Sequence, residues 1–353
     1  MPPAIEADEL AITFKGGVRA LDGVSFAVEP GSVFGLLGPN GAGKTTVVRI
    51  LTTVLLPDTG RGRVLGHDVV AEAGLVRTLF GLAGQYAAVD ETLTGRENLR
   101  MVARLNHLRR ADAARRADDL LERFGLGQAG DRTLKTYSGG MRRRLDLAAA
   151  LVAEPGVLFL DEPTTGLDPQ SRIDLWGVID ELVTEGTTVL LTTQYLEEAD
   201  RLARKVAVVD HGRVISQGTP TELKAALGAT VLEVGLADEA AARRAAEALA
   251  PLGRGMPHLD GKQLELPVDE GPRAAVAALR ALDQAGLEPA RFALREPSLD
   301  DVFLALTGRA AEDRAGADGF PGNGTGDGDG TQTARRRRGR TRDRSGDGAA
   351  VRR

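Results

Sequence analysis

Between residues 5 and 217, the chain alternates short apolar runs with amphipathic stretches and glycine-rich turns. Three apolar runs have little polar interruption and lie at residues 33–37, 157–160 and 187–193. Such runs are typical of strands that are buried on both faces of a parallel sheet. The pattern therefore predicts one α/β core, with a hairpin near its end where two further apolar runs flank His211 and Gly212.

The pattern of apolar and polar residues changes after the turn-and-helix segment 219–228. Strand patterns at residues 231–236, 262–268 and 290–296 alternate with helix patterns at residues 238–253, 272–286 and 298–308. This order resembles a small split βαβ, ferredoxin-like module. In the last helix, four apolar residues share one face that we expect to be buried: Leu299, Val302, Phe303 and Leu306. We place the core domain at residues 5–222 and an accessory α+β module at residues 229–308.

The last segment, residues 309–353, is dominated by Gly, Asp, Thr and Arg. Because it has almost nothing apolar to bury, folding cannot recover its entropy cost, and we expect a disordered tail. The final 43 residues carry a net charge of +3, so the rest of the chain carries −8. An acidic body disfavours nucleic acid as the main ligand. The run Arg335–Arg338 suits anionic lipid or nucleic acid, but a solvated charged tail is the simpler interpretation.

The 353 residues include no cysteine, which excludes disulfides, thiol nucleophiles and thiolate metal sites. The longest apolar run is seven residues, 147–153, whereas a membrane-spanning helix needs about 20. The amino terminus lacks the basic flank and apolar stretch of an export signal, so we expect a protein made and kept in the cytosol. Any membrane role would then require a partner. The four histidines are scattered without ligand spacing.

Residues Gly38 to Thr45 match the pattern G-x-x-x-x-G-K-[ST] between a predicted strand and a predicted helix. The glycines let backbone N–H groups turn inward around a phosphate chain, and the helix start adds its positive dipole end. Lys44 would bring a point charge to the β- and γ-phosphates, and the Thr45 hydroxyl would ligate Mg²⁺. A glycine turn before a structural helix is the alternative, but the strand-loop-helix order favours phosphate binding.

A second group of candidate residues follows the apolar run 157–160, which delivers Asp161 at a strand end with Glu162 immediately after it. Adjacent residues on a strand point to opposite sides, so the two acids can hold different roles. Asp161 would serve the metal, and Glu162 would act as general base on the attacking water. A solvated loop is the alternative for such a pair, but the buried strand before it disfavours that.

Ser138, Gly139 and Gly140 open a predicted amphipathic helix, with Ser138 as its N-cap. Two glycines at a helix start leave free N–H groups and a dipole that faces outward, which makes a second anion site. One chain with two phosphate sites needs a second chain to use both. Taken alone, Ser-Gly-Gly would be an ordinary helix cap.

Residues 5–222 resemble the ATP-binding subunit of an ABC transporter, with a P-loop NTPase fold. The resemblance rests on four features in this order: GPNGAGKTT, Gln85, YSGGMRRRLDLA and LFLDEPTTGLDP. The signature YSGGM, the segment TTQYLEEAD and the closing SLDDVFLALTG resemble the daunorubicin-resistance type, which extends the match to about residue 308. The resemblance implies a homodimer with ATP between the phosphate loop of one subunit and the signature of the other. It also implies that Gln85 contacts Mg²⁺ and links to the membrane partner, and that Asp168 lies across the dimer seam. The implied phosphate-loop contacts are Gly38, Pro39, Asn40, Gly41, Ala42, Gly43, Lys44, Thr45 and Thr46.

Three positions depart from this family pattern. Met141 stands where the signature usually has Gln, and Gln194 stands where the switch residue is usually His. Gln194 can donate a hydrogen bond to the γ-phosphate but cannot carry a charge, so we assign the base role to Glu162. The aromatic residue that stacks on adenine would fall at Lys15 by the usual spacing, and Phe14 is our candidate. A strand core residue is the alternative for Phe14.

The leading hypothesis is an ATPase that dimerises on ATP and drives a separate membrane permease to export a hydrophobic drug or antibiotic, at the cytoplasmic face of the membrane. A soluble ABC ATPase that acts on ribosomes or DNA is the alternative. Such proteins usually carry two ATPase halves or a long coiled-coil insertion, and neither is visible. A non-catalytic nucleotide-binding protein would lack a base, whereas Glu162 is present.

Overall fold

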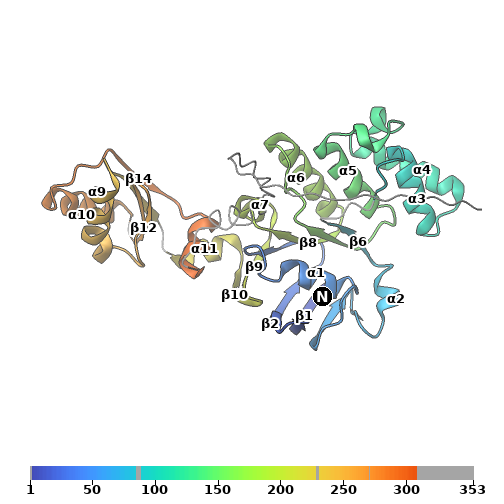
Figure 1. Ribbon diagram of the computed structural model, residues 1–353, viewed down its shortest axis with the longest axis horizontal. Helices are drawn as coiled ribbons and strands as arrows, with labels where there is room; N and C mark the ends of the chain where they lie inside the picture. The colour runs from blue at the N-terminus through green and yellow to red at the C-terminus, as the bar shows by residue number, and fades with distance from the viewer. Residues whose placement is uncertain (1, 85–88, 228–229, 270, 308–353) are drawn as a thin grey trace, which may run out of the picture. The chain divides into compact units, whose positions relative to one another are not determined.

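The computed structural model describes residues 2–84, 89–227, 230–269 and 271–307 (Figure 1). The predictions for Gln85 and for the tail 309–353 lie outside these residues. Within the described part of the chain, no helix is long and apolar enough to cross a membrane.

A six-stranded sheet forms the centre of the N-terminal domain, in the order β10-β9-β3-β8-β7-β6. Its strands are β3 (Val33–Leu37), β6 (Phe80–Ala83), β7 (Val157–Asp161), β8 (Thr188–Thr193), β9 (Lys205–Asp210) and β10 (Arg213–Gly218). Strands β9, β3, β8, β7 and β6 are parallel, and β10 pairs antiparallel with β9. The predicted parallel sheet and the predicted hairpin are both confirmed.

A second sheet is antiparallel, in the order β2-β1-β4-β5. It consists of β1 (Ile5–Phe14), β2 (Val18–Val28), β4 (Thr59–Val64) and β5 (His67–Asp68). Helix α1 (Lys44–Leu51) lies between the two sheets, because its buried side chains share one apolar cluster with both (Figure 1). The helix ends at Leu51.

Strand β3 shows how the central sheet is covered on both faces. Its side chains alternate, so Phe34 and Leu36 join the cluster with α1, whereas Val33 and Leu37 join the cluster on the opposite face. A continuous apolar run is the sequence form of this arrangement. The end of the strand at Leu37 is thereby fixed between two packed layers, and the loop that follows starts from a rigid position.

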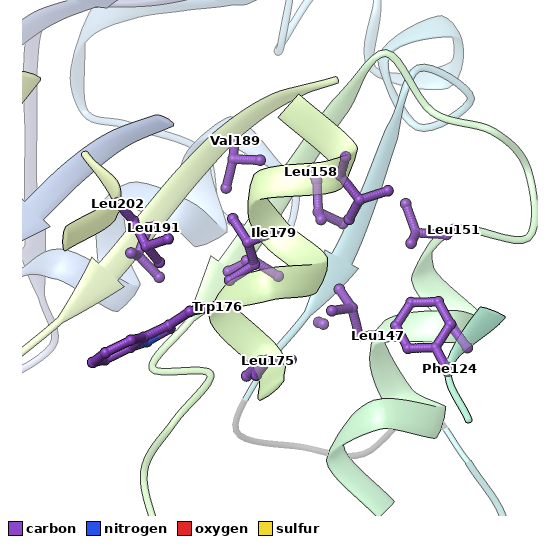
Figure 2. Close-up of a cluster of buried hydrophobic side chains, with 14 of the residues drawn as sticks. Phe124, Leu147, Leu151, Leu158, Leu175, Trp176, Ile179, Val189, Leu191 and Leu202 are labelled. Atoms are coloured by element: carbon purple, nitrogen blue, oxygen red, sulfur yellow. The ribbon is translucent and has the colours of Figure 1, made fainter. Parts of the chain in front are cut away.

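Helices cover the opposite face of the central sheet. They are α3 (Gly95–Leu105), α4 (Arg110–Arg123), α5 (Gly139–Ala150), α6 (Pro169–Thr184) and α7 (Leu196–Leu202), and the short helices α2 (Ala73–Val76), η1 (Gly127–Ala129) and η2 (Leu134–Thr136) lie in the connections. Figure 2 shows the cluster where α6 contributes Leu175, Trp176 and Ile179 against Val189 and Leu191 of β8. Helix α8 (Pro220–Leu227) follows β10.

The C-terminal module has its own antiparallel sheet, in the order β12-β13-β11-β14. Its elements are β11 (Thr230–Gly235), α9 (Glu239–Leu249), η3 (Ala250–Leu252), β12 (His258–Asp260), β13 (Gln263–Val268), α10 (Gly271–Gln284) and β14 (Arg291–Arg295). Residues of α9, α10 and the sheet make a separate apolar cluster. The βαββαβ order and the antiparallel pairing confirm the ferredoxin-like fold. The sequence pattern missed β12, which has only three residues.

The last helix, α11 (Leu299–Thr307), contributes to the core of the ATPase domain. Leu299, Val302 and Phe303 are buried in the cluster that contains Leu196 of α7 and Leu223 of α8. The expectation that Leu306 shares this buried face is wrong, because its side chain is 43% exposed. One helical turn beyond Phe303, the helix has already passed the edge of the cluster.

Candidate functional site

The phosphate loop runs from the end of β3 to the start of α1, and its glycines are required by the backbone. Gly38 has φ 155°, and a Cβ atom on it would lie 2.2 Å from the carbonyl oxygen of Val209. Gly43 has φ 108°, and a Cβ atom there would lie 2.7 Å from the carbonyl oxygen of Ala20. Both positions therefore exclude other residues, and the loop passes close against β9 and the start of β2.

Lys44 is the first residue of α1, and its side chain is only 4% exposed. Its Nζ donates to the carbonyl oxygens of Gly38 at 2.8 Å and Pro39 at 3.1 Å. The same nitrogen lies 3.5 Å from Oε1 of Glu162. Burial lowers the pKa of Lys44, and the Glu162 carboxylate opposes that shift. The ammonium group is thus held inside the loop, where phosphate oxygens would replace carbonyl oxygens as its partners.

Thr45 and Asp161 meet beside the phosphate loop. The Thr45 hydroxyl donates to Oδ1 of Asp161 at 3.1 Å, and Thr192 on β8 donates to the same oxygen at 2.5 Å. The side chain of Asp161 is buried at the end of β7. Its carboxylate is therefore oriented by two hydroxyl groups from two other elements. The contribution of Thr192 was not predicted from the sequence, because it depends on the pairing of β7 with β8.

Glu162 follows β7 in a left-handed backbone conformation, with φ 52°. Its N–H donates to the backbone oxygen of Thr192 at 3.0 Å and to the Thr192 hydroxyl at 3.1 Å. Its carboxylate lies near Lys44 on one oxygen and accepts from Thr165 at 3.5 Å on the other. The two adjacent acids therefore face different partners, Asp161 toward Thr45 and Glu162 toward Lys44.

A cleft of about 420 Å³ opens over the phosphate loop. It is lined by Phe14, Val18, Arg19, Ala20, Asn40, Gly41, Gly43, Lys44, Thr45, Thr46 and Glu162. Phe14 is the last residue of β1, and its side chain is 39% exposed. An exposed aromatic ring beside a phosphate-binding loop suits a planar base. The structure therefore brings Phe14, the phosphate loop and Glu162 to one cleft.

The signature residues lie elsewhere on the domain and line no part of this cleft. Ser138 caps α5 and accepts from the N–H of Met141 at 3.3 Å. Asp168 caps α6 and accepts from the N–H of Ser171 at 3.0 Å and from its hydroxyl at 2.6 Å. A Cβ atom on Gly140 would lie 2.5 Å from that hydroxyl oxygen. Ser171 thus places Asp168 beside the start of α5, and its hydroxyl lowers the Asp168 pKa.

Gln194 follows β8 and lies near the other side of the phosphate loop. Together with Gly38, Pro39, Leu196 and Phe303 it surrounds a small cavity. The C-terminal helix α11 therefore reaches the phosphate loop and the switch position through Phe303. The sequence pattern predicted a buried face on this helix, but not what it packs against.

Comparison with known proteins shows two families that match this chain. The ABC transporter family matches residues 21–165, and the family of DrrA1-3-like C-terminal domains of ATP-binding proteins matches residues 218–307. The daunorubicin resistance ATP-binding protein DrrA3 of Streptomyces coeruleorubidus is 56% identical over 83% of this chain and 92% of its own length. The daunorubicin/doxorubicin resistance ATP-binding protein DrrA of Streptomyces peucetius is 53% identical over 88% and 94%.

A more distant relative and a solved structure also belong to ABC transport systems or export proteins by their names. A Nod factor export ATP-binding protein I of Paraburkholderia xenovorans is 40% identical over 88% of this chain and 99% of its own length. The structure of cbiO1 from Clostridium perfringens, part of the ABC transporter complex cbiONQ, has a TM-score of 0.59 at 28% identity. It covers 63% of this chain and 91% of that one.

Proposed function

Since this chain belongs to the ABC transporter family of ATP-binding proteins and is the ATP-hydrolysing subunit of an exporter, we propose a mechanism for its site and a partner for the chain. In this proposal, two copies bind ATP between them, hydrolyse it with Glu162 as general base, and drive a separate membrane permease. The observation that carries the catalytic part is the 3.5 Å separation between Lys44 Nζ and Glu162 Oε1. A γ-phosphate held by Lys44 lies within reach of a water molecule on Glu162.

In this reaction, Glu162 accepts a proton from water while the water oxygen bonds to the γ-phosphorus and the bond to the ADP oxygen breaks. Its backbone is held by two hydrogen bonds to Thr192, so the carboxylate is positioned before the water arrives. Gln194, at the cavity beside Pro39, donates a hydrogen bond to the γ-phosphate. Lys44 balances the charge on the phosphate oxygens.

The residues at the end of β7 fit a magnesium ion. The Thr45 hydroxyl and the Asp161 carboxylate are 3.1 Å apart, and both are the hard oxygen ligands that Mg²⁺ prefers. Among the described residues, no group of three or more acidic or histidine side chains could hold a metal alone. We propose that Mg²⁺ would take the Asp161 carboxylate and complete its shell with phosphates and water. When bound, the ion neutralises charge on the phosphates. Gln85, the third proposed ligand, lies outside the described residues.

The second nucleotide contact comes from the partner subunit in our proposal. Helix α5 starts at Gly139, and a Cβ atom built on this glycine would meet nothing within 4 Å, so the helix start is open. The free N–H groups and the dipole of this helix start suit the γ-phosphate of ATP bound on another copy. Asp168 lies beside this helix start through Ser171, which supports a position for it at the same seam. We therefore propose a homodimer with two shared nucleotides.

The permease contact is proposed at α3, which begins soon after the Gln85 segment. Its capping box fixes its start at Thr94, with Glu97 as the partner. Leu105 is 71% exposed and Met101 is 36% exposed on this helix, although other apolar residues of α3 are buried. Apolar side chains at this position suit a short helix of a membrane partner at the cytoplasmic face.

The exported compound is proposed to be a hydrophobic drug or antibiotic, because two relatives that are more than half identical to this chain are named for daunorubicin or doxorubicin resistance. The test uses a host strain that lacks this chain and measures its doxorubicin sensitivity and efflux. Wild-type chain should restore resistance, and Glu162→Gln should not. Equal rescue by both would contradict ATP-driven export.

A second experiment identifies the permease. Isolation of tagged Glu162→Gln chain from membranes in the presence of ATP should recover one integral membrane protein, which is then the permease. Recovery of ribosomes or DNA instead would favour the alternative function.

A further inference from the structure

Arg143, in the first turns of α5, holds the backbone around the proposed base. Its Nε donates to the carbonyl oxygen of Pro163 at 2.6 Å. Its Nη2 donates to the carbonyl oxygens of Asp161 at 3.3 Å and Glu162 at 3.1 Å. One guanidinium group therefore binds three consecutive carbonyl groups at the end of β7. The middle one belongs to Glu162, whose left-handed backbone is the least common conformation in this segment.

The same side chain reaches a second element. Its Nη1 donates to the carbonyl oxygen of Gly84 at 2.6 Å, directly after β6, and lies 3.4 Å from Oδ2 of Asp146. The side chain of Arg143 is 16% exposed and that of Asp146 is 4% exposed. Burial lowers the pKa of Arg143, and Asp146 is the first of the acids that oppose this shift. A buried cation with its donors on backbone carbonyl groups has little freedom to move independently of them.

The position of Arg143 on α5 gives these contacts a direction. The helix starts at Gly139 after the Ser138 cap, so Arg143 lies just over one turn from the helix start and two residues after the signature ends at Met141. The start of this helix is the part that, in the proposed homodimer, contacts the nucleotide of the other subunit. A shift of α5 toward that nucleotide would move Arg143 and, through its hydrogen bonds, the carbonyl groups of Asp161, Glu162 and Pro163.

We propose that Arg143 is a positioning residue that couples the two nucleotide sites of the dimer: ATP bound against the signature of one subunit aligns Glu162 of that same subunit for its own ATP. This inference rests on the proposed homodimer. Hydrolysis is then cooperative in ATP, because each site is fully aligned only when the other holds nucleotide. Neither the signature alone nor the phosphate loop alone connects the two nucleotide sites in this way.

The neighbouring arginines supply a matched control. Arg144 donates to the carbonyl oxygen of Phe124 at 3.2 Å, and Arg142 pairs with Glu91 at 2.8 Å. Both lie on the same helix as Arg143, and among the residues that the structure describes neither has a hydrogen bond to the segment that carries Glu162. An effect that belongs to Arg143 and not to Arg144 therefore cannot be assigned to a general loss of charge on α5.

The experiment compares Arg143→Met, Arg143→Lys and Arg144→Met in the full chain. The readouts are kcat, the ATP concentration at half-maximal rate, the Hill coefficient, nucleotide affinity and the melting temperature. The wild type should show a Hill coefficient above 1. Arg143→Met should lower kcat by about 10²-fold, the loss expected for a misplaced catalytic group, and bring the Hill coefficient to 1. Affinity for a fluorescent ATP analogue should change less than twofold, because the phosphate loop is intact.

Arg143→Lys should recover part of kcat and part of the cooperativity, since an ammonium group can bind some of the carbonyl oxygens but cannot span them all. It also keeps the proposal testable if Arg143→Met folds poorly. Arg144→Met should keep kcat within twofold and leave the Hill coefficient unchanged. A lower kcat in Arg143→Met and Arg143→Lys with an unchanged Hill coefficient would show an anchoring role alone and overturn the coupling. A wild-type Hill coefficient of 1 would also overturn it.

A separate measurement distinguishes this failure from failure of the proposed function. In a Glu162→Gln background, ATP should convert the chain to a dimer on size exclusion, with or without Arg143→Met. If Glu162→Gln stays monomeric with ATP, the homodimer proposal fails and the coupling fails with it. If the dimer forms but Arg143→Met keeps wild-type kcat and cooperativity, only the coupling is wrong.

Discussion

The ammonium nitrogen of Lys44 lies 3.5 Å from Oε1 of Glu162, although one residue starts α1 and the other follows β7. Both side chains are more than nine-tenths buried. Their separation matches what phosphate hydrolysis needs: a cation for the phosphate and an adjacent carboxylate for the water. The fold produces it because β3 and β7 are parallel, so the segments after them emerge at the same edge of the sheet.

Glu162→Gln should keep ATP binding and nearly abolish turnover, because the amide has the same shape but cannot accept a proton from water. We expect a loss of at least about 10²-fold in kcat, at the lower end for general base catalysis. Dimers with trapped ATP should accumulate on size exclusion. Asp238→Asn is a useful comparison, because that carboxylate caps α9 in the C-terminal module and lies outside the cleft. Near-normal hydrolysis by Glu162→Gln would move the base role to another group.

Lys44→Ala should fail at an earlier step and lose nucleotide affinity together with hydrolysis. The buried ammonium group is bound to the carbonyl oxygens of Gly38 and Pro39, so its removal also leaves the loop without its central cation. Binding of a fluorescent ATP analogue measures the effect, with the exposed Lys262 between β12 and β13 as the control position, Lys262→Ala. An unchanged affinity in Lys44→Ala would contradict the phosphate role.

The phosphate loop and the acidic pair were predictable from sequence because their chemistry lies in short local motifs. A strand, a glycine loop and a helix are consecutive, and Asp161 and Glu162 directly follow a buried run. Local pattern also predicted the capping role of Ser138, which the structure shows. These predictions needed no knowledge of which strands pair.

The supporting contacts were not predictable in the same way. Thr192 reaches Asp161 only because β8 pairs with β7, and Arg143 reaches Gly84 only because α5 packs beside β6. The antiparallel sheet was also missed as a separate layer, since β4 is mostly exposed and short of apolar residues. Phe303 belongs to this class too, because a buried helical face does not identify its partner.

Gln194→His should be tolerated and is expected to raise the hydrolysis rate, since it restores the residue type common in the wider family. Gln194→Ala should be slower by roughly 10²-fold, if the lost hydrogen bond to the γ-phosphate acts like one from an oxyanion hole. Steady-state ATPase rates at saturating ATP measure both variants. A wild-type rate in Gln194→Ala would remove this side chain from the switch.

Glu198 should make stability depend on pH. Burial raises its pKa above the ordinary value, while hydrogen bonds from Thr193, Trp176 and Thr164 act in the opposite direction. A raised folded pKa means that its stabilising contribution is present below the ordinary pKa of about 4.5 and is lost as pH rises through the folded value. The slope is at most about 1.4 kcal/mol per pH unit.

The matched variant is Glu198→Gln, whose oxygen can accept from Trp176 and whose amide can donate to the Thr164 hydroxyl. In urea unfolding at several pH values between 5 and 8, the stability of Glu198→Gln should change less with pH than the stability of the wild type. Stability of Glu198→Gln relative to the wild type should therefore rise with pH. Parallel profiles for the two proteins would show that Glu198 keeps an ordinary pKa.

The two C-terminal segments are expected to differ in their effect on the ATPase domain. Truncation after Gly308 should leave ATPase activity and melting temperature unchanged, because the residues beyond it have almost nothing apolar to bury. Truncation after Gly228 removes the accessory module and α11, so it should weaken dimerisation or permease association. It should also lower the melting temperature, since Leu299, Val302 and Phe303 leave the core. A loss of half the activity on removal of the tail alone would give the Arg335–Arg338 run a function.

A single substitution separates the role of α11 in the core from the role of the module. Phe303 is 2% exposed beside Pro39 and Gln194, so Phe303→Ala should cost about 3–5 kcal/mol of stability. Leu306→Ala, on the exposed side of the same helix, should stay within about 0.5 kcal/mol. Urea unfolding of the full chain, followed by the fluorescence of Trp176, measures both. Because the cavity at Phe303 adjoins the phosphate loop, Phe303→Ala should also lower the ATPase rate at temperatures where the protein is still folded. Equal stability of the two variants would show that α11 does not pack on the ATPase domain in solution.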